Sequence, residues 1–291
     1  MELRLLSAGR LAPTPSGDLH LGNITAFYAA WLSARSTGAR LLLRMEDVDT
    51  GRARLDVEER QRACLRWLGL EWDAETPRQS ARSYAEPLAA LADHTYRCVC
   101  TRRELRERPC PCDGAGQREG AVRFRAPQRT MAVHDRRHGV TQQLPAEHGD
   151  PILVRRDGLV GYPLAVVADD IRDGVTEVVR GDDLHSFTAV QQHLWLALGA
   201  TPPSWLHTPL VKGPDGRKLS KSHNSSHIDH LREAGWQPED VLELVGSWLG
   251  LPTAVTHEAV RHFDPSRIPP GPIHLPDPEL PSPGSLRWQR G

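Results

Sequence analysis

The stretch 9–23, GRLAPTPSGDLHLGN, combines residue types that can hold a phosphate group. Its prolines and glycines exclude regular structure and let the backbone approach a ligand closely. Helical periodicity follows at 24–34, so His20 and Asn23 fall near a helix start, where N–H groups and the positive dipole end attract anions. His20 could also donate a hydrogen bond to a developing phosphoryl charge. Taken by itself, the stretch is also compatible with a loop that has no chemical role.

The stretch 209–222, PLVKGPDGRKLSKS, holds all the lysines of the chain, which are Lys212, Lys218 and Lys221. Every other basic side chain is an arginine or a histidine. Lysine carries a compact and mobile ammonium group, whereas the guanidinium of arginine is planar. A loop with glycines, ammonium groups and hydroxyls can close over a triphosphate. The alternative is a basic surface loop.

Four of the five cysteines form two Cys-x-Cys pairs, and these are Cys98, Cys100, Cys110 and Cys112. Such a set can supply four thiolates to a tetrahedral zinc and staple a segment that has little core of its own. Four thiolates leave no open position, so we expect a structural metal and not a catalytic one. Free thiols are the alternative. Cys64 lies in a helical pattern without a charged activator, which indicates a core thiol.

Charged side chains follow three predicted strands. They are Glu46, Asp47 and Asp49 after strand 39–44, Asp169 and Asp170 after strand 162–168, and Arg180, Asp182 and Asp183 at and after the end of strand 177–180. A doubly wound sheet places its ligand contacts at the carboxyl ends of its strands. The alternatives are a solvated acidic loop for the first group and buried ion pairs for Asp182 and Asp183.

Hydrophobic periodicity predicts an α/β protein, and the charged residues at the strand ends fit a doubly wound, Rossmann-like parallel sheet. We expect helices over 24–34, 56–70, 80–96 and 186–198, and strands over 3–6, 39–44, 122–125, 151–155, 162–168 and 177–180.

The composition is that of an ordinary globular protein, with 291 residues, 25% charged side chains and a net charge of −1. It gives no global argument for nucleic acid, although a local basic face remains compatible with it. No apolar run approaches the roughly 20 residues that span a bilayer, and the N-terminus lacks the apolar core of a signal peptide. We therefore expect a cytoplasmic protein without a membrane partner.

The two loops together resemble the signature motifs of class I aminoacyl-tRNA synthetases. GRLAPTPSGDLHLGN, RMEDVDT, YPLAVVADD, VVRGDDL and GRKLSKS occur in this order, and the set resembles the glutamyl-tRNA synthetase branch over most of residues 4–250. Only about seventy residues follow Lys221, and the proline-rich stretch 251–291 cannot build a helical anticodon-binding bundle. The chain therefore resembles the glutamyl-Q tRNA(Asp) synthetase family, which lacks that region.

The resemblance implies a catalytic domain that is split by an insertion similar to an acceptor-binding domain. The implied units are 1–95 and 161–211 for the two halves of the catalytic domain, 96–160 for the zinc-containing insertion, 212–250 for the lysine loop and a helical stem-contact-like region, and 251–291 for a tail.

The resemblance also implies a pocket for glutamate. Arg10 and Arg180 would hold its carboxylate, a bidentate task suited to guanidinium, and Glu46 would take its ammonium group. The rest of the implied pocket is Leu11, Ala12, Pro13, Thr14 and Tyr162.

The implied ATP contacts are His20, Asn23 and Lys221, and the implied catalytic set is His20, Lys218 and Lys221. His20 would face the phosphates, and Lys221 would steady the triphosphate and the leaving pyrophosphate with help from Lys218. Mg²⁺ is expected with ATP. Asn23 replaces the second histidine of the first motif, and it can donate a hydrogen bond without carrying charge. Cys110 stands near the place where the family usually has a tyrosine ligand for zinc.

The implied activity is ATP-dependent formation of glutamyl-adenylate and transfer of glutamate to the queuosine base in the anticodon loop of tRNA(Asp). The expected partners are ATP, L-glutamate and tRNA, with one structural Zn²⁺ per chain and a monomeric state. One alternative is a short glutamyl-tRNA synthetase that charges the 3′ end of tRNA(Glu). Another is a tRNA-binding paralogue without catalysis, which the presence of Arg10, Glu46, Arg180 and Lys221 disfavours.

Overall fold

The computed structural model describes residues 7–101, 103–114, 116, 119–219, 227–252 and 256–275. Its first half is a parallel sheet of order β1-β2-β3, formed by β1 (Ala8–Leu11), β2 (Arg40–Leu43) and β3 (Ala74–Glu75). The crossover helices are α1 (Leu21–Thr37) and α2 (Leu55–Trp67). This βαβαβ unit is the first half of a doubly wound fold.

The second half is a four-stranded sheet of order β7-β6-β10-β9. Its strands are β6 (Met131–Asp135), β7 (Gly139–Gln143), β9 (Glu177–Gly181) and β10 (Ser204–Thr208). β6, β10 and β9 are parallel, and β7 returns antiparallel to β6 as a hairpin. The helix α6 (Thr188–Ala197) connects β9 to β10.

The two halves meet where β9 lies beside β1. Thr176 donates its backbone N–H to the Ala8 carbonyl at 2.8 Å, and the Ala8 N–H donates to Thr176 Oγ1 at 3.0 Å. The order in space is therefore β3-β2-β1-β9-β10-β6. From β1 the later strands of the first half are added on one side, and β9 and β10 are added on the other side. Doubly wound sheets bind ligands outside the carboxyl ends of the strands at this switch point.

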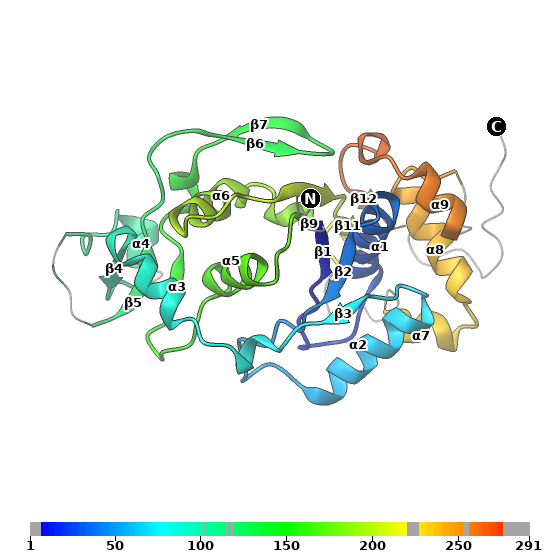
Figure 1. Ribbon diagram of the computed structural model, residues 1–291, viewed down its shortest axis with the longest axis horizontal. Coiled ribbons are helices and arrows are strands. Elements are labelled where there is room, and N and C mark those ends of the chain that lie inside the picture. The colour runs from blue at the N-terminus through cyan, green and yellow to red at the C-terminus, as the bar shows by residue number, and fades with distance from the viewer. Residues whose placement is uncertain are drawn as a thin grey trace, which may run out of the picture.

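Helix α1 is buried over most of its circumference because it lies between the sheet and the C-terminal helices (Figure 1). Ile24, Tyr28 and Leu32 are spaced four residues apart and are fully buried in the main core. The helix ends at Gly38, whose φ of 67° is the left-handed conformation that favours glycine. A helix fixed in this way holds its N-terminus rigidly against the carboxyl end of β1.

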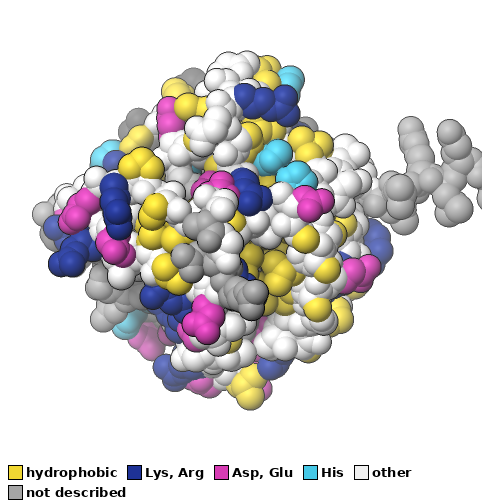
Figure 2. Space-filling model, turned by 90° about the vertical axis from the view of Figure 1, so that its left-hand side faces the viewer, with side chains coloured by type: hydrophobic (Ala, Val, Ile, Leu, Met, Phe, Trp, Pro, Cys, Tyr) yellow, Lys and Arg dark blue, Asp and Glu magenta, His cyan; other side chains and the backbone are white. Residues whose placement is uncertain are grey.

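Two segments, before β6 and after β7, build a separate antiparallel sheet of order β4-β5-β8, at the left end of Figure 1. Its elements are α3 (Ala85–Ala90), β4 (Thr95–Cys98), α4 (Glu104–Glu107), β5 (Ala121–Phe124), β8 (Ile152–Val154) and α5 (Tyr162–Arg172). Figure 2 shows this end of the molecule, where basic and acidic side chains are intermixed and neither sign dominates.

The C-terminal part packs on the first half of the molecule. Its elements are β11 (Val211–Lys212), α7 (Ile228–Glu233), α8 (Pro238–Trp248), α9 (Thr256–His262) and β12 (Ile273–His274). Short 3-10 turns occupy Gln79–Ala81, Ala92–His94, Pro145–His148, Asp182–Leu184 and Pro265–Arg267. In the part of the chain that the structure describes, no helix combines the length and apolar character needed to cross a membrane.

Two predicted elements are wrong. The run 162–168 is the start of helix α5 and not a strand. Most of the run is buried, so its hydrophobic pattern does not distinguish a helix from a strand, and Pro163 is well tolerated in the first turn of a helix. The predicted helix 80–96 shrinks to α3, and its last residues belong to β4. The predicted strand 3–6 lies outside the described residues. The first described strand, β1, includes Gly9 and Arg10, which we assigned to the loop.

The other predicted helices and strands are confirmed within a few residues. Strand β6, within the range expected for the insertion, pairs with β10 of the second half. Ala259, Phe263 and Ile268, within the range expected for the tail, are buried in the same core as α1. These contacts bear on the expected domain boundaries, which remain a proposal.

Candidate active site

A cavity of about 860 Å³ opens at the carboxyl ends of β1 and β9. This is the switch point of the sheet, where the fold itself predicts a ligand. Ten of the site residues proposed from the sequence line it, and these are Arg10, Ala12, Pro13, Thr14, His20, Asn23, Glu46, Tyr162, Arg180 and Lys218. Leu11 differs, because its side chain is fully buried in the core and does not line the cavity. Lys221 lies outside the described residues.

His20 is the N-cap of α1 and forms a capping box with Asn23. Asn23 donates its backbone N–H to His20 Nδ1 at 3.3 Å, and its side-chain oxygen accepts the His20 N–H at 3.1 Å. Because Nδ1 is an acceptor, the ring carries its proton on Nε2, which is the donor nitrogen. A Cβ on Gly22 would lie only 3.0 Å from the His20 ring, so glycine allows the ring to fold against the helix start.

Arg10 at the end of β1 is held by two groups of other elements. Its Nε–H donates to Asp170 Oδ1 at 3.2 Å, and Nη1 donates to the Val179 carbonyl at 3.1 Å. Within the described residues, its three other N–H groups have no protein partner. Arg10 can therefore present two parallel N–H donors to a carboxylate, as expected.

Glu46 follows β2, the strand next to β1, and its backbone N–H donates to the Pro13 carbonyl at 2.9 Å. Its Oε1 is 3.4 Å from Nη2 of Arg44. Burial raises the pKa of Glu46, while Arg44 and Arg10 oppose that shift. A buried carboxylate of this kind gains from a further cation, and the ammonium group of an amino acid would supply one. Burial and the neighbouring Glu46 raise the pKa of Tyr162, so its hydroxyl keeps its proton.

Arg180 at the end of β9 has uncharged hydrogen-bond partners. Nε donates to His207 Nε2 at 3.0 Å, Nη1 donates to Gln191 Oε1, and Nη2 donates to Thr188 Oγ1 at 2.9 Å and to the Leu184 carbonyl at 3.4 Å. Four of its five N–H groups are thus engaged. The bidentate contact that we expected of Arg180 is not available in this arrangement, because at most one N–H of Nη1 remains and the Tyr162 hydroxyl also interacts with the guanidinium.

Lys218 reaches the cavity from the lysine loop and forms an ion pair with Asp183. Half of the Lys218 side chain is exposed, so this pair is weak and can exchange for a phosphate. Asp183, for which buried ion pairing was left open, therefore contacts the ammonium group that was expected to assist Lys221.

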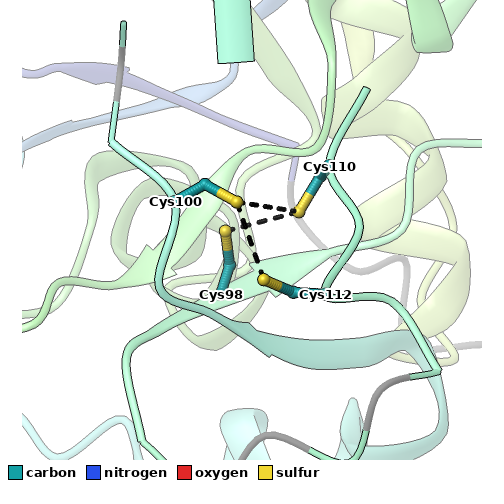
Figure 3. Close-up of side chains that lie close together, drawn as sticks. All are labelled: Cys98, Cys100, Cys110 and Cys112. Atoms are coloured by element: carbon teal, nitrogen blue, oxygen red, sulfur yellow. Dashed lines mark hydrogen bonds between the residues drawn. The ribbon is translucent and has the colours of Figure 1, made fainter. Parts of the chain in front are cut away.

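The four cysteines come together as expected, on the segment that runs from β4 past α4 (Figure 3). The Sγ atoms of Cys98 and Cys110 are 3.4 Å apart, those of Cys100 and Cys110 are 3.9 Å apart, and those of Cys100 and Cys112 are 3.6 Å apart. A tetrahedral zinc with Zn–S bonds of about 2.3 Å requires sulfur separations of about 3.8 Å. The cluster can therefore hold a zinc ion, with Cys110 as one of its ligands.

The electrostatics of Cys110 suit a metal ligand. Burial alone would raise the pKa of the Cys110 thiol, but hydrogen bonds from the Cys112 backbone and from Tyr96 lower it, whereas burial raises the pKa of Cys98 and of Cys100. Cys64 is buried far from this cluster in the main core, and burial raises its pKa to about 12. It is the inert core thiol that we expected.

Sequence reasoning missed the residues that hold the cavity-lining side chains in place. Arg44 bonds Glu46 and Asp170. Thr188, Gln191 and His207 bond Arg180 directly, and Asp135 bonds His207. Arg44 and His207 each lie at or next to the end of a strand, which was the one available signal.

Comparison with known proteins places these observations among synthetases. A family model described as tRNA synthetases class I (E and Q), catalytic domain, matches residues 8–110 and 113–269. The glutamyl-Q tRNA(Asp) synthetase of Nocardia farcinica is 40% identical over 295 residues, covering 93% of each chain. That of Nitratidesulfovibrio vulgaris is 45% identical over 265 residues, covering 78% of this chain and 81% of the relative.

The fold is also similar to that of a solved structure. The glutamate-tRNA synthetase of Elizabethkingia anophelis matches with a TM-score of 0.79 and 24% identity, over 94% of this chain and 68% of that one. At this level of identity, the match shows that the two proteins share a fold.

Proposed function

Because the chain belongs to the class I tRNA synthetases (E and Q), and within them to the glutamyl-Q tRNA(Asp) synthetases, we propose that it activates L-glutamate with ATP and transfers the glutamate to the queuosine base of tRNA(Asp). The observation that carries the proposal is that two buried side chains of opposite charge, Arg10 and Glu46, line the same cavity. Arg10 offers N–H donors to a carboxylate, and Glu46 offers a carboxylate to an ammonium group. The two together complement a zwitterionic amino acid.

The first step is formation of the adenylate. The α-carboxylate of glutamate attacks the α-phosphorus of ATP in line, the bond to the β-phosphate oxygen breaks, and pyrophosphate leaves. The protein contributes position and charge: the start of α1 and the Nε2–H of His20 face the phosphates, and Lys218 and Lys221 neutralise the leaving group. Mg²⁺ enters with ATP as part of the substrate. Asn23 supports His20 through the capping box.

In the second step, a hydroxyl of the modified base attacks the acyl carbon of glutamyl-adenylate. An ester forms, the mixed anhydride bond breaks, and AMP leaves. The tRNA is therefore the second substrate, and it must reach the cavity from its open side.

The remaining parts of the proposal concern the frame around the cavity. Cys98, Cys100, Cys110 and Cys112 would hold one structural zinc, which would order the segment between β4 and β5. Residues 96–160 form the insertion and 212–250 form the lysine loop and stem-contact-like region, with 251–291 as the tail. The protein acts as a monomer in the cytoplasm.

Transfer of labelled glutamate tests the function. The purified protein is incubated with ATP and one of two tRNA pools, one containing queuosine and one from cells unable to make it. Label in the queuosine pool alone is the expected result. Equal label in both pools would instead indicate charging of the 3′ end of tRNA(Glu), and no label in either would indicate a paralogue without catalysis.

A further inference from the structure

Arg180 is immobilised on its edges and on one face. His207, Gln191 and Thr188 accept its N–H groups, and its guanidinium carbon lies 4.8 Å from the ring centroid of Trp205. The Trp205 ring is nearly parallel to that of His207, with an interplanar angle of 19°. A long side chain with four engaged donors and a stacked face has one orientation available to it.

None of the side-chain acceptors around Arg180 is a carboxylate. Arg10 and Arg44 differ, because both bond Asp170. The charge of Arg180 is therefore buried without a directly bonded counter-ion in the described part of the chain. Burial lowers its pKa accordingly. A cation in this position gains strongly from an incoming carboxylate, since the attraction is large where water is excluded.

One anion, Asp135, is separated from Arg180 by the imidazole ring of His207. Asp135 Oδ2 lies 2.7 Å from His207 Nδ1 and also accepts the His207 backbone N–H at 3.1 Å. Its Oδ1 accepts the backbone N–H groups of Arg137 and His138 at 2.8 and 2.9 Å. The carboxylate is therefore ionised, and these bonds and His207 lower its pKa despite burial.

This arrangement fixes the tautomer of His207. Nδ1 must carry the proton to bond the Asp135 carboxylate, so Nε2 is left as an acceptor for Arg180. The ring is fully buried. Burial lowers its pKa to about 4, and the ring is therefore neutral at physiological pH.

The three residues lie on three neighbouring parallel strands. Asp135 ends β6, His207 lies in β10, and Arg180 lies in β9. In the strand pairing, Trp205 is opposite Asp135, and His207 is directly opposite Arg180. The hydrogen-bond chain thus runs across the carboxyl edge of the sheet from β6 to the cavity.

We propose that Asp135 and His207 are positioning residues for substrate binding: they hold Arg180 through a neutral acceptor, so that its full charge remains for a carboxylate of glutamate. This inference rests on the proposed function. A carboxylate bonded directly to Arg180 would orient it equally well but would neutralise it. The imidazole orients the guanidinium without adding a negative charge at its edge.

The test compares His207→Asn with His207→Gln. The amide of asparagine reaches the place of Nδ1 and keeps a donor for Asp135, but it leaves Arg180 Nε without an acceptor. The carbonyl of glutamine reaches the place of Nε2 and can accept from Arg180. His193→Asn, on α6 and away from the cavity, is the matched control.

Kinetics of glutamate-dependent exchange between pyrophosphate and ATP give the readout. For His207→Asn we expect the KM for glutamate to rise about tenfold or more, because one hydrogen bond orienting a charged group is lost, while the KM for ATP stays within about twofold. His207→Gln should recover most of the loss. A His207→Asn enzyme with the wild-type KM for glutamate would overturn the proposal. Wild-type protein that neither binds nor activates glutamate would instead refute the proposed function.

A second measurement does not depend on catalytic activity. ¹⁵N NMR of labelled histidine in the wild-type protein distinguishes the two imidazole nitrogens, with the His207→Gln spectrum assigning the signal. We expect a proton on Nδ1 and a hydrogen-bonded, unprotonated Nε2 from pH 7 down to about pH 5. A proton on Nε2 in that range would contradict the proposed acceptor role.

Discussion

The guanidinium of Arg44 bonds the carboxylate of Asp170 at 2.6 Å, and their side chains are 0% and 3% exposed. The same Nη2 lies 3.4 Å from Glu46, and Nη1 lies 3.2 Å from Asp173. Asp170 also bonds Arg10. Arg44 thus contacts Glu46 directly and is linked to Arg10 through their shared partner, Asp170.

Arg44→Met should destabilise the protein by about 3–5 kcal/mol, because it leaves buried carboxylates without their cation. Urea unfolding followed by circular dichroism measures this. Arg54→Met, which removes an exposed arginine paired with Asp56, should have a much smaller effect. Equal effects of the two substitutions would show that the buried network does not stabilise the fold.

Arg10→Lys should raise the KM for glutamate by about ten- to a hundredfold, because an ammonium group cannot replace two parallel N–H donors to a carboxylate. The KM for ATP should change little. Exchange kinetics with each substrate varied in turn separate the two. Arg54→Lys is the matched surface control. A rise confined to the KM for ATP would contradict the position assigned to glutamate.

Lys221→Ala should lower the rate of adenylate formation about a hundredfold or more, equivalent to about 3 kcal/mol of lost charge stabilisation in the transition state. Lys212→Ala provides the control, since Lys212 belongs to the same basic stretch but pairs through its backbone with β12 and does not line the cavity. Normal activation of glutamate by Lys221→Ala protein would refute the assignment.

Purified protein should contain one zinc per chain, and Cys110→Ser should lower that content and its resistance to a chelator. Metal analysis by mass spectrometry, before and after dialysis against a chelator, gives the result. Cys64→Ala should keep the full zinc content, because Cys64 lies in the main core. Full zinc in the Cys110→Ser protein would remove Cys110 from the ligand set.

Stability should fall with acid in a window set by His207. Its pKa is about 4 in the fold against the ordinary 6.5, so the unfolded chain binds a proton first as the pH drops. Above about pH 6.5 the titration of His207 does not change the free energy of unfolding. At pH 5 it lowers that free energy by about 2 kcal/mol. The charged or titratable groups facing the ring are Asp135, Arg180 and His185.

Urea unfolding at pH 7 and pH 5 measures that loss, and His207→Gln should reduce the difference between the two pH values by about 2 kcal/mol. Comparing wild type with the variant cancels the contribution of His185 and His193, whose pKa values are also lowered by burial. The lowered pKa of Asp135 acts only below about pH 4, outside this window. An unchanged difference in the variant would indicate that His207 titrates normally.

Local patterns in the sequence did not predict β6, β7 or β10. They determined several other strands and helices, the loop before α1 and the clustering of the cysteines. Each of these depends on residues close together along the chain. The uncertain cases were short apolar runs such as 162–168, because burial on all sides removes the periodicity that separates a strand from a helix. The tertiary structure identified this run as α5 and so placed Asp170 beside Arg10.

The resemblance of the sequence to a known family named most of the chemical groups that line the cavity, and the rule that strand ends meet at one edge of the sheet agrees with their being close together. It did not show how those groups are held. His207 is 72 residues from Asp135 and 27 from Arg180, and these contacts exist only because β6, β10 and β9 are neighbours in the sheet. Strand order is set by packing over the whole domain, so the partners and the remaining donors of Arg10 and Arg180 were decided by the tertiary structure.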